Sequence, residues 1–222
     1  MNIPAILDLF EKCDFEAVSE GSYYEQIWLA MPQDFRVNCT YDNGVSKCVF
    51  IPRGANYVIK VPFSYKDDVS EYYDSSDNTW KYCEDGYEFT GAMYGPGWDY
   101  CYAEAVLYNK AVKAGVAKAF CKTRCIGKVY DYPIYVQERA KLEFRVCEDE
   151  ATTSRTKQLC RENNYYNFNT NWQANALKYY GEAFFKKLME FIEREKLDDF
   201  HSGNIGYIGD RPVLLDFSSY DS

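Results

Sequence analysis

Apolar residues follow two kinds of spacing along the chain, and each kind predicts a different element. Spacings of three and four residues predict amphipathic helices, whereas short runs rich in β-branched and aromatic residues predict strands. Helices are expected at residues 5–10, 23–31, 99–112 and 172–196, the last being the longest. Strands are expected at residues 36–41, 47–52, 57–62, 125–130 and 133–138, with a closing hairpin from 206–208 and 213–216. Residues 152–171 show no clear period and are interpreted as a loop or an irregular helix.

The order of these elements predicts an α+β fold. Asp42, Asn43 and Gly44 are a strong hairpin signal between the first two strands, and the third strand follows after a short turn. One helix then precedes two further strands, so the expected sheet has five antiparallel strands. An insertion at residues 64–98, rich in Asp, Ser, Gly, Asn and Tyr, is expected to be acidic and partly mobile. The expected organisation is a helical extension at 1–35, a sheet lobe at 36–138 and an abbreviated, mainly helical lobe at 139–222.

Composition and charge narrow the class of protein. With 222 residues, of which 47% are hydrophobic, the chain is long and apolar enough to bury a core. The formal charge of -9 argues against a nucleic-acid partner, because phosphate contacts need clustered Lys and Arg. No leader sequence and no apolar run of membrane length is seen, so no membrane partner is expected. A cytoplasmic protein is the resulting expectation.

The nine cysteines are scattered and form no CxxC pair, and His201 is the only histidine. Cys121 and Cys125 are the closest pair, four residues apart. A zinc site usually needs closely spaced Cys and His ligands, so reduced thiols in the core or at helix ends are the better interpretation.

Candidate chemistry is concentrated near the end of the chain. Asp199, Asn204 and Asp216 have a spacing that phosphoryl transfer can use: one acid accepts a proton from the attacking hydroxyl, and the other two residues hold a metal on the nucleotide phosphates. A polar turn between a helix and a hairpin is the alternative interpretation. The expected hairpin places Asp216 across from Asn204.

Two further residues help to decide between a site for phosphoryl transfer and a polar turn. Lys60 lies among apolar neighbours on the third predicted strand, where a lysine must either extend to water or find an anionic partner. Glu104, beside the apolar face of the predicted helix at 99–112, is the candidate partner.

A glycine-containing hairpin, a strand lysine, a helix glutamate, an acid–Asn loop and a late acid thus follow one another in order. This order resembles the protein-kinase-like fold, which includes protein kinases and small-molecule phosphotransferases such as those acting on aminoglycosides. The resemblance covers most of the chain and implies a bilobal architecture. The loop His201-Ser202-Gly203-Asn204 looks most like kinase-like proteins of bacteriophages and bacteria, including the early protein kinase of T7-like phages. A phage or prophage origin, and action in the host cytoplasm, would follow.

The resemblance implies a role for each matching residue of the first lobe. Gly44, Ser46 and Lys47 match the loop that covers the phosphates, although this loop has a single glycine. Lys60 matches the lysine that contacts the α- and β-phosphates, and Glu104 matches the glutamate that orients it.

The remaining matches complete a site for ATP and Mg²⁺. Glu138 and Ala140 match the segment between the lobes whose backbone holds the adenine, and Gln137 matches the position that gates the rear of that pocket. Asp199 then matches the catalytic base, and Asn204 and Asp216 match the metal ligands.

Two functions from different classes remain open. The first is an ATP- and Mg²⁺-dependent phosphotransferase acting on a hydroxyl, with a host protein or the chain itself as acceptor. The second is a weak or inactive kinase-like binding module that inhibits a host protein. The truncated C-terminal part, the acidic insertion at 64–98 and the charge of -9 favour the second. The chain also departs from the family where Leu197 and Asp198 replace the usual His and Arg, and where Ser218 replaces a glycine. Only five residues follow Phe217, so neither an activation segment nor a peptide-docking helical part is expected.

Overall fold

The computed structural model describes residues 2–12, 31–43, 47–62, 64–65, 70–74, 79–83, 89–90, 100–129 and 132–217. By its internal contacts the chain divides into two compact units. The first unit consists of Met1–Ala103 and Thr123–Gln137, and the second consists of Glu104–Lys122 and Glu138–Ser222. The change of unit after Gln137 lies close to the predicted lobe boundary, whereas residues 104–122, expected in the sheet lobe, group with the second unit. Within the described residues, no helix is both long and apolar enough to cross a membrane.

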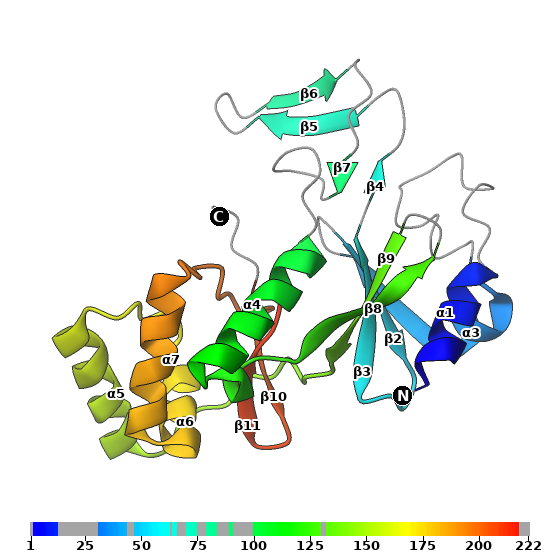
Figure 1. The fold of residues 1–222 in the computed structure, drawn as a ribbon. Coiled ribbons are helices and arrows are strands. Elements are labelled where there is room, and N and C mark those ends of the chain that lie inside the picture. Colours follow the sequence, from blue (N-terminus) through cyan, green and yellow to red (C-terminus); the bar gives the residue numbers. More distant parts are fainter. Residues whose placement is uncertain are drawn as a thin grey trace. The chain divides into compact units, whose positions relative to one another are not determined.

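The first unit is built on a five-stranded sheet (Figure 1). Its strands are β1 (Cys39–Asn43), β2 (Lys47–Pro52), β3 (Tyr57–Pro62), β9 (Tyr132–Glu138) and β8 (Thr123–Val129), in that spatial order. The pairs β1 with β2, β2 with β3, and β8 with β9 are antiparallel. The α+β class and the five-stranded sheet are therefore confirmed, and β2 and β3 begin and end at the predicted residues.

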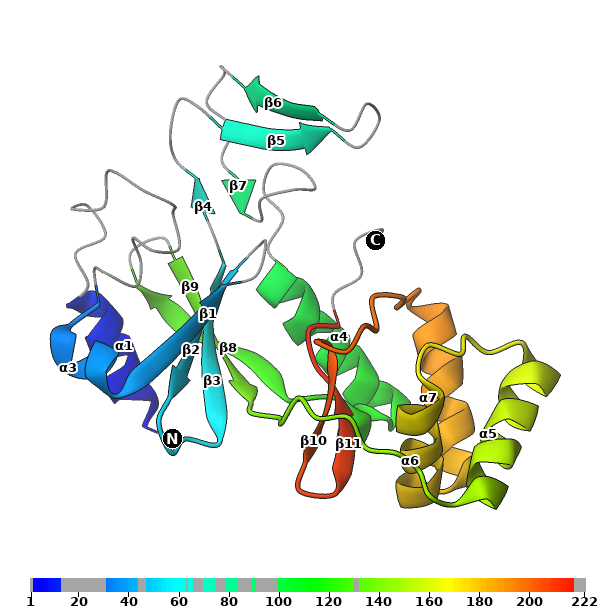
Figure 2. The same ribbon diagram turned by 180° about the vertical axis from the view of Figure 1, so that it is seen from behind.

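Two helices, α1 (Ile3–Glu11) and α3 (Gln33–Val37), lie beside this sheet in both ribbon views (Figures 1 and 2). Phe10 of α1 is fully buried and meets Phe50 of β2 edge-on, with ring centroids 5.7 Å apart. The strand predicted at 36–41 begins later than expected, because its first two residues finish α3. The helix predicted at 23–31 lies outside the described residues, apart from Met31.

The insertion predicted at 64–98 contains two small antiparallel sheets. In one, β4 (Ser64–Tyr65) pairs with β7 (Phe89–Thr90), and in the other, β5 (Ser70–Asp74) pairs with β6 (Thr79–Cys83). The rest of this insertion, and with it the expectation of partial mobility, lies outside the described residues.

The second unit combines helices with a hairpin. Its elements are α4 (Tyr100–Ala114, whose first turn belongs to the first unit), the 3₁₀ helix η1 (Ala117–Ala119), α5 (Glu150–Asn163), α6 (Thr170–Tyr180), α7 (Glu182–Arg194), β10 (Ile205–Ile208) and β11 (Arg211–Leu214). Residues 152–171 were expected to be irregular, but most of them belong to α5. Asp149 caps this helix by accepting bonds from the Thr152 N–H at 3.1 Å and hydroxyl at 2.8 Å, which hold the pKa of Asp149 below its usual value.

The single helix predicted at 172–196 is wrong, because the chain breaks at Gly181 into α6 and α7. Gly181 has φ +82° and ψ 161°, a conformation that favours glycine and that no helix contains. After this break Ala183 of α7 is exposed, whereas Phe185 is fully buried.

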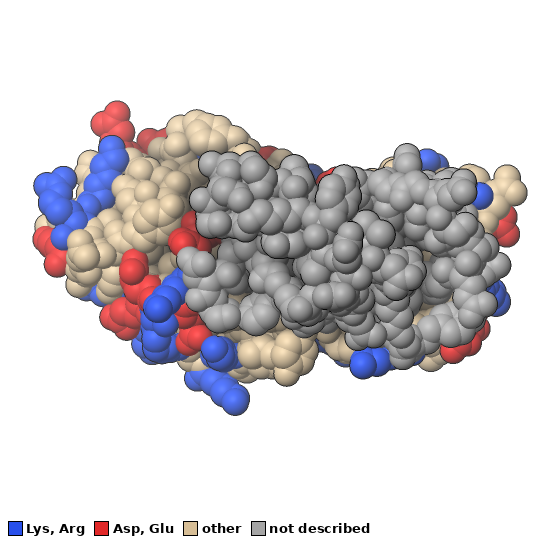
Figure 3. Space-filling model, turned by 90° about the horizontal axis from the view of Figure 1, so that it is seen from above, with Lys and Arg blue, Asp and Glu red and all other residues tan. Residues whose placement is uncertain are grey.

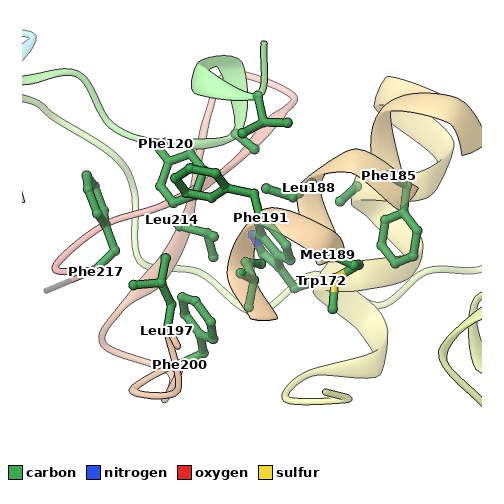
Figure 4. Packing of buried hydrophobic residues seen from close by; sticks show 14 of the residues in the cluster. Phe120, Trp172, Phe185, Leu188, Met189, Phe191, Leu197, Phe200, Leu214 and Phe217 are labelled. Carbon is green, nitrogen blue, oxygen red and sulfur yellow. The ribbon is translucent and has the colours of Figure 1, made fainter. Parts of the chain in front are cut away.

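Aromatic and aliphatic side chains fill the core of the second unit (Figure 4). Phe120 lies at its centre, with ring centroids 5.5 Å from Phe191 of α7 and 4.9 Å from Phe217. Leu197 and Phe200 reach the same core from the loop after α7. The core thus holds the segments before β10 and after β11, which carry the candidate acids Asp199 and Asp216.

Charged residues of both signs are mixed on the surface. In Figure 3, Lys and Arg side chains lie next to Asp and Glu at the end that carries α5 and α7. One such group is Glu182, which the Arg155 guanidinium approaches to 2.8 Å and Lys186 to 2.9 Å. The hydrogen bond from Arg155, together with that from Lys186, lowers the pKa of Glu182 to about 2.

Seven of the described cysteines are free thiols, and among these seven only Cys125 is exposed. Burial raises the pKa of Cys39 to about 11 and that of Cys48 to about 12. These two thiols stay protonated at neutral pH and act as small core residues, as expected. Cys121 is also buried, but the predicted core or helix-end position does not apply to Cys125, which lies on β8.

Candidate functional site

The loop that carries Asp199 is held at both sides by buried residues. After α7 ends, Lys196 turns the chain with φ +52°, and the Leu197 N–H donates to the carbonyl of Ile192 at 3.0 Å. Leu197 and Phe200 are both buried, and the Phe200 ring lies 4.4 Å from that of Phe168. Asp199 therefore occupies a fixed position between two anchors, with its side chain 26% exposed.

Asn204 ties this loop together. Its side-chain N–H₂ donates to the Asp199 carbonyl oxygen at 2.8 Å and to the Asp199 carboxylate at 3.2 Å. Its backbone N–H donates to the carbonyl of His201 at 2.9 Å, which closes the turn between them. Only 4% of Asn204 is exposed, so these bonds are sheltered from water. The amide thus holds the carboxylate of Asp199 in one orientation.

Asp216 is brought to the same place by the hairpin. The register pairs Ile205 with Leu214, and the Leu215 N–H donates to the Asn204 carbonyl at 2.9 Å. The prediction that Asp216 faces Asn204 is thus off by one residue, because Leu215 faces it and Asp216 follows. Asp216 adopts φ +51°, a left-handed conformation that non-glycine residues rarely adopt, and such strain is concentrated at functional sites.

Gly206 positions the hairpin against the segment that follows β9. Lys141 and Tyr207 exchange two backbone hydrogen bonds, of 2.8 Å and 3.0 Å. A Cβ at Gly206 would lie 2.6 Å from the Lys141 carbonyl oxygen, a backbone atom that cannot turn aside. Glycine is therefore required at this position for the close approach of the two chains.

We expect Gly206→Ala to lower the free energy of unfolding by about 1–3 kcal/mol, because the backbone must shift to remove the overlap. Gly203→Ala is the matched control: its Cβ would meet only the His201 ring, at 2.7 Å, and an exposed side chain can rotate away. Urea unfolding of both variants measures the difference. Equal destabilisation by the two substitutions would contradict this account of Gly206.

The residues present fit a magnesium ion that is also bound by phosphate. Because the Asn204 nitrogen donates to Asp199, the side-chain oxygen of Asn204 is the atom left for a cation. Together with the Asp216 carboxylate it supplies hard oxygen donors, and Mg²⁺ is commonly held by one or two such residues plus substrate phosphates. Among the described residues, no group of three or more His, Cys, Asp or Glu forms a metal site by itself.

Three predicted nucleotide-binding residues belong to the first unit. Lys60 on β3 is 3% exposed and pairs in register with Val49, so this lysine does not extend to water and its charge needs partners within the protein. Lys47 on β2 is also buried, and the Gln137 side-chain N–H₂ donates to the Thr123 hydroxyl at 2.7 Å. Gly44 and Ser46, which with Lys47 make up the predicted phosphate-covering loop, lie outside the described residues.

The other predicted residues belong to the second unit. Glu104 on α4 is fully buried, whereas Ala140 is half-buried in the connection after β9. The Glu138 carboxylate accepts from the Lys122 N–H and from the Arg211 guanidinium, each at 3.0 Å. Because Lys60 and Glu104 fall in different units, their pairing stays a prediction.

A cavity of about 260 Å³ in the second unit was not predicted. Its lining comes from residues 142–145, from Asn169 and Trp172 near the start of α6, and from Ser202, Ile205 and Tyr207. Residues 141–148, which we name the strap, lie within residues 139–150, a stretch that the sequence predicts to be a polar connection. The available signal was the alternation of Leu142, Phe144 and Val146, which is typical of an extended segment with one apolar side.

In comparisons with known proteins, the chain matches no family model, and no curated protein or solved structure is significantly similar to it.

Proposed function

We propose that the chain is a kinase-like phosphotransferase that moves the γ-phosphoryl group of ATP to a hydroxyl of a protein. The observation that carries this proposal is the double hydrogen bond from Asn204 to Asp199, combined with the backbone bond that ties Asn204 to the residue before Asp216. A polar turn needs no such arrangement, in which one buried amide orients an acid and directs its own oxygen elsewhere.

In this mechanism Asp199 is the general base. Its carboxylate accepts the proton of the attacking hydroxyl as that oxygen bonds to phosphorus, and Asn204 keeps the carboxylate aimed at it. Asn204 and Asp216 would hold Mg²⁺, which would neutralise negative charge on the phosphate oxygens. Lys60, with Glu104 to orient it, contacts the α- and β-phosphates, while Gly44, Ser46 and Lys47 cover them. Gln137, Glu138 and Ala140 bind the adenine.

The arrangement of the first unit supports the kinase-like, bilobal interpretation. Its sheet has the order β1-β2-β3-β9-β8, so that β9, the last strand before the change of unit, lies beside β3. A five-stranded antiparallel sheet of this kind is compatible with the sheet lobe that the resemblance implies. The chain changes unit directly after Gln137, which is where the segment between two lobes is expected.

Thermal unfolding with and without Mg²⁺-ATP tests the nucleotide site. A ligand that binds only the folded state stabilises it by about 2.7 kcal/mol at one hundred times its dissociation constant, so we expect a clear rise in Tm. ATP alone, in the presence of a chelator, should give a smaller rise. Release of labelled phosphate then tests transfer, with water as the acceptor. An unchanged Tm at millimolar Mg²⁺-ATP would contradict the proposal and favour the binding module.

A further inference from the structure

The cavity in the second unit adjoins the loop of the proposed base. Ser202 lines the cavity and lies three residues after Asp199, within the turn that Asn204 closes. Ile205 and Tyr207, from the strand that follows, form part of its wall, and Trp172 of α6 contributes an aromatic face. A group bound in this cavity therefore lies next to the part of the chain that handles the acceptor hydroxyl.

The single cationic group in the lining is already engaged within the protein. The Arg145 guanidinium donates to Glu143, to Asp210 at 3.2 Å and to the Gly209 carbonyl at 2.9 Å. Its flat face covers the Tyr207 ring, 4.2 Å from the ring centroid. Glu143, the one acid in the lining, is paired with the same guanidinium. The guanidinium is thus matched by two carboxylates, so the cavity offers no unpaired cation to a phosphate or a carboxylate.

The size of the cavity suits one large side chain. At about 260 Å³ it is smaller than the roughly 300–1,000 Å³ typical of pockets for drug-sized ligands. An apolar cavity of about 150 Å³ is enough to hold a benzene ring. This volume therefore accommodates one aromatic or leucine-like side chain.

The rim of the cavity continues this apolar character. Leu142 is 58% exposed and Phe144 is 72% exposed, and both line the cavity from the strap. Val146 follows at the same two-residue spacing and is 61% exposed, but it does not line the cavity. These side chains alternate along a segment that forms no helix, and such an alternating apolar surface suits a second, extended chain.

We propose that this cavity binds one large apolar side chain, aromatic or leucine-like, from an extended segment of the protein acceptor, close to the hydroxyl that Asp199 deprotonates. The proposal rests on the proposed function, and it names the feature by which a protein acceptor is recognised. Burial of the side chain against Leu142 and Phe144, which are exposed, supplies the selectivity.

A set of fluorescently labelled nine-residue peptides tests this assignment. Each peptide carries one central Ser, Thr or Tyr, and Phe, Leu, Ala or Lys is placed in turn at each flanking position. Binding is measured by fluorescence anisotropy without nucleotide, and transfer is measured with labelled ATP. We expect a Phe or Leu peptide to exceed its Ala counterpart by about 10- to 100-fold in affinity and in kcat/KM.

Two variants of the strap provide the matched comparison. Phe144→Ala should reduce the preference for Phe over Ala by about tenfold. Val146→Ala removes an equally exposed neighbour outside the cavity and should leave the preference unchanged. Equal effects of the two substitutions, or equal binding of Phe and Ala peptides, would overturn the assignment. Phosphate release to water in the absence of peptide reports the proposed function separately, so apolar-selective binding without such release would overturn the function and keep the cavity assignment.

Discussion

Replacing Asp199 with asparagine is expected to reduce phosphoryl transfer by about 10²- to 10⁴-fold, which is the usual contribution of a positioned general base. The side-chain oxygen of an asparagine can still accept the hydrogen bond that Asn204 donates at 3.2 Å, so the loop should keep its shape. The amide cannot take up a proton at neutral pH, and this is the one property that the substitution removes. Labelled phosphate transfer, measured as a single-turnover rate, detects the loss.

Asp198→Asn is the control for this substitution. Asp198 is the neighbouring acid, it is exposed, and it carries the same charge, so general electrostatic effects on ATP should be the same for both variants. We expect Asp198→Asn to retain the rate, and both variants to retain the rise of Tm with Mg²⁺-ATP. Unchanged transfer in Asp199→Asn would remove Asp199 from the role of base.

The second large effect is expected at Asp216, where the loss of the carboxylate should abolish the Mg²⁺-dependent part of the stabilisation by ATP. The wild-type gain of about 2.7 kcal/mol at one hundred times the dissociation constant should fall to the smaller gain that ATP gives without Mg²⁺. Transfer should be lost as well, since Asn204 alone is a weak magnesium site.

The backbone of Asp216 decides how this experiment is designed. At φ +51°, alanine adds strain of about 1–2 kcal/mol, whereas glycine adopts this conformation freely. Asp216→Gly therefore removes the carboxylate without penalising the fold, and it is the preferred variant. Asp210→Gly, in the exposed turn of the same hairpin, is the control, because the Asp210 side chain is 94% exposed. A Mg²⁺-dependent rise of Tm that persists in Asp216→Gly would exclude Asp216 as the metal ligand.

Much of the first unit was predictable because its strands are specified locally. β2 and β3 are short runs rich in β-branched and aromatic residues, separated by turn residues that include Gly54 at φ +74°. β1 ends at Asn43, and the Asn-Gly pair at this point of the sequence is likewise typical of a turn. Where strand propensity and turn chemistry agree within a few residues, the pattern alone places the element.

The helices of the second unit were less predictable because tertiary packing stabilises them more than their local sequence pattern indicates. α5 is polar over most of its length, and its Leu159 and Cys160 are buried only because α6 packs against it. α6 and α7 share one apolar period, and only the backbone of Gly181 separates them. Tertiary packing overrides a weak local preference in such segments.

The sequence by itself determined which residues carry the candidate chemistry, because an acid, an amide and a second acid at this spacing are recognisable wherever they fold. It did not determine how they are joined. The turn brings the Asn204 side chain to Asp199, and the register of the hairpin places Leu215, instead of Asp216, opposite Asn204. The cavity was decided by tertiary structure alone, since its walls come from three separate stretches of chain that only packing brings together.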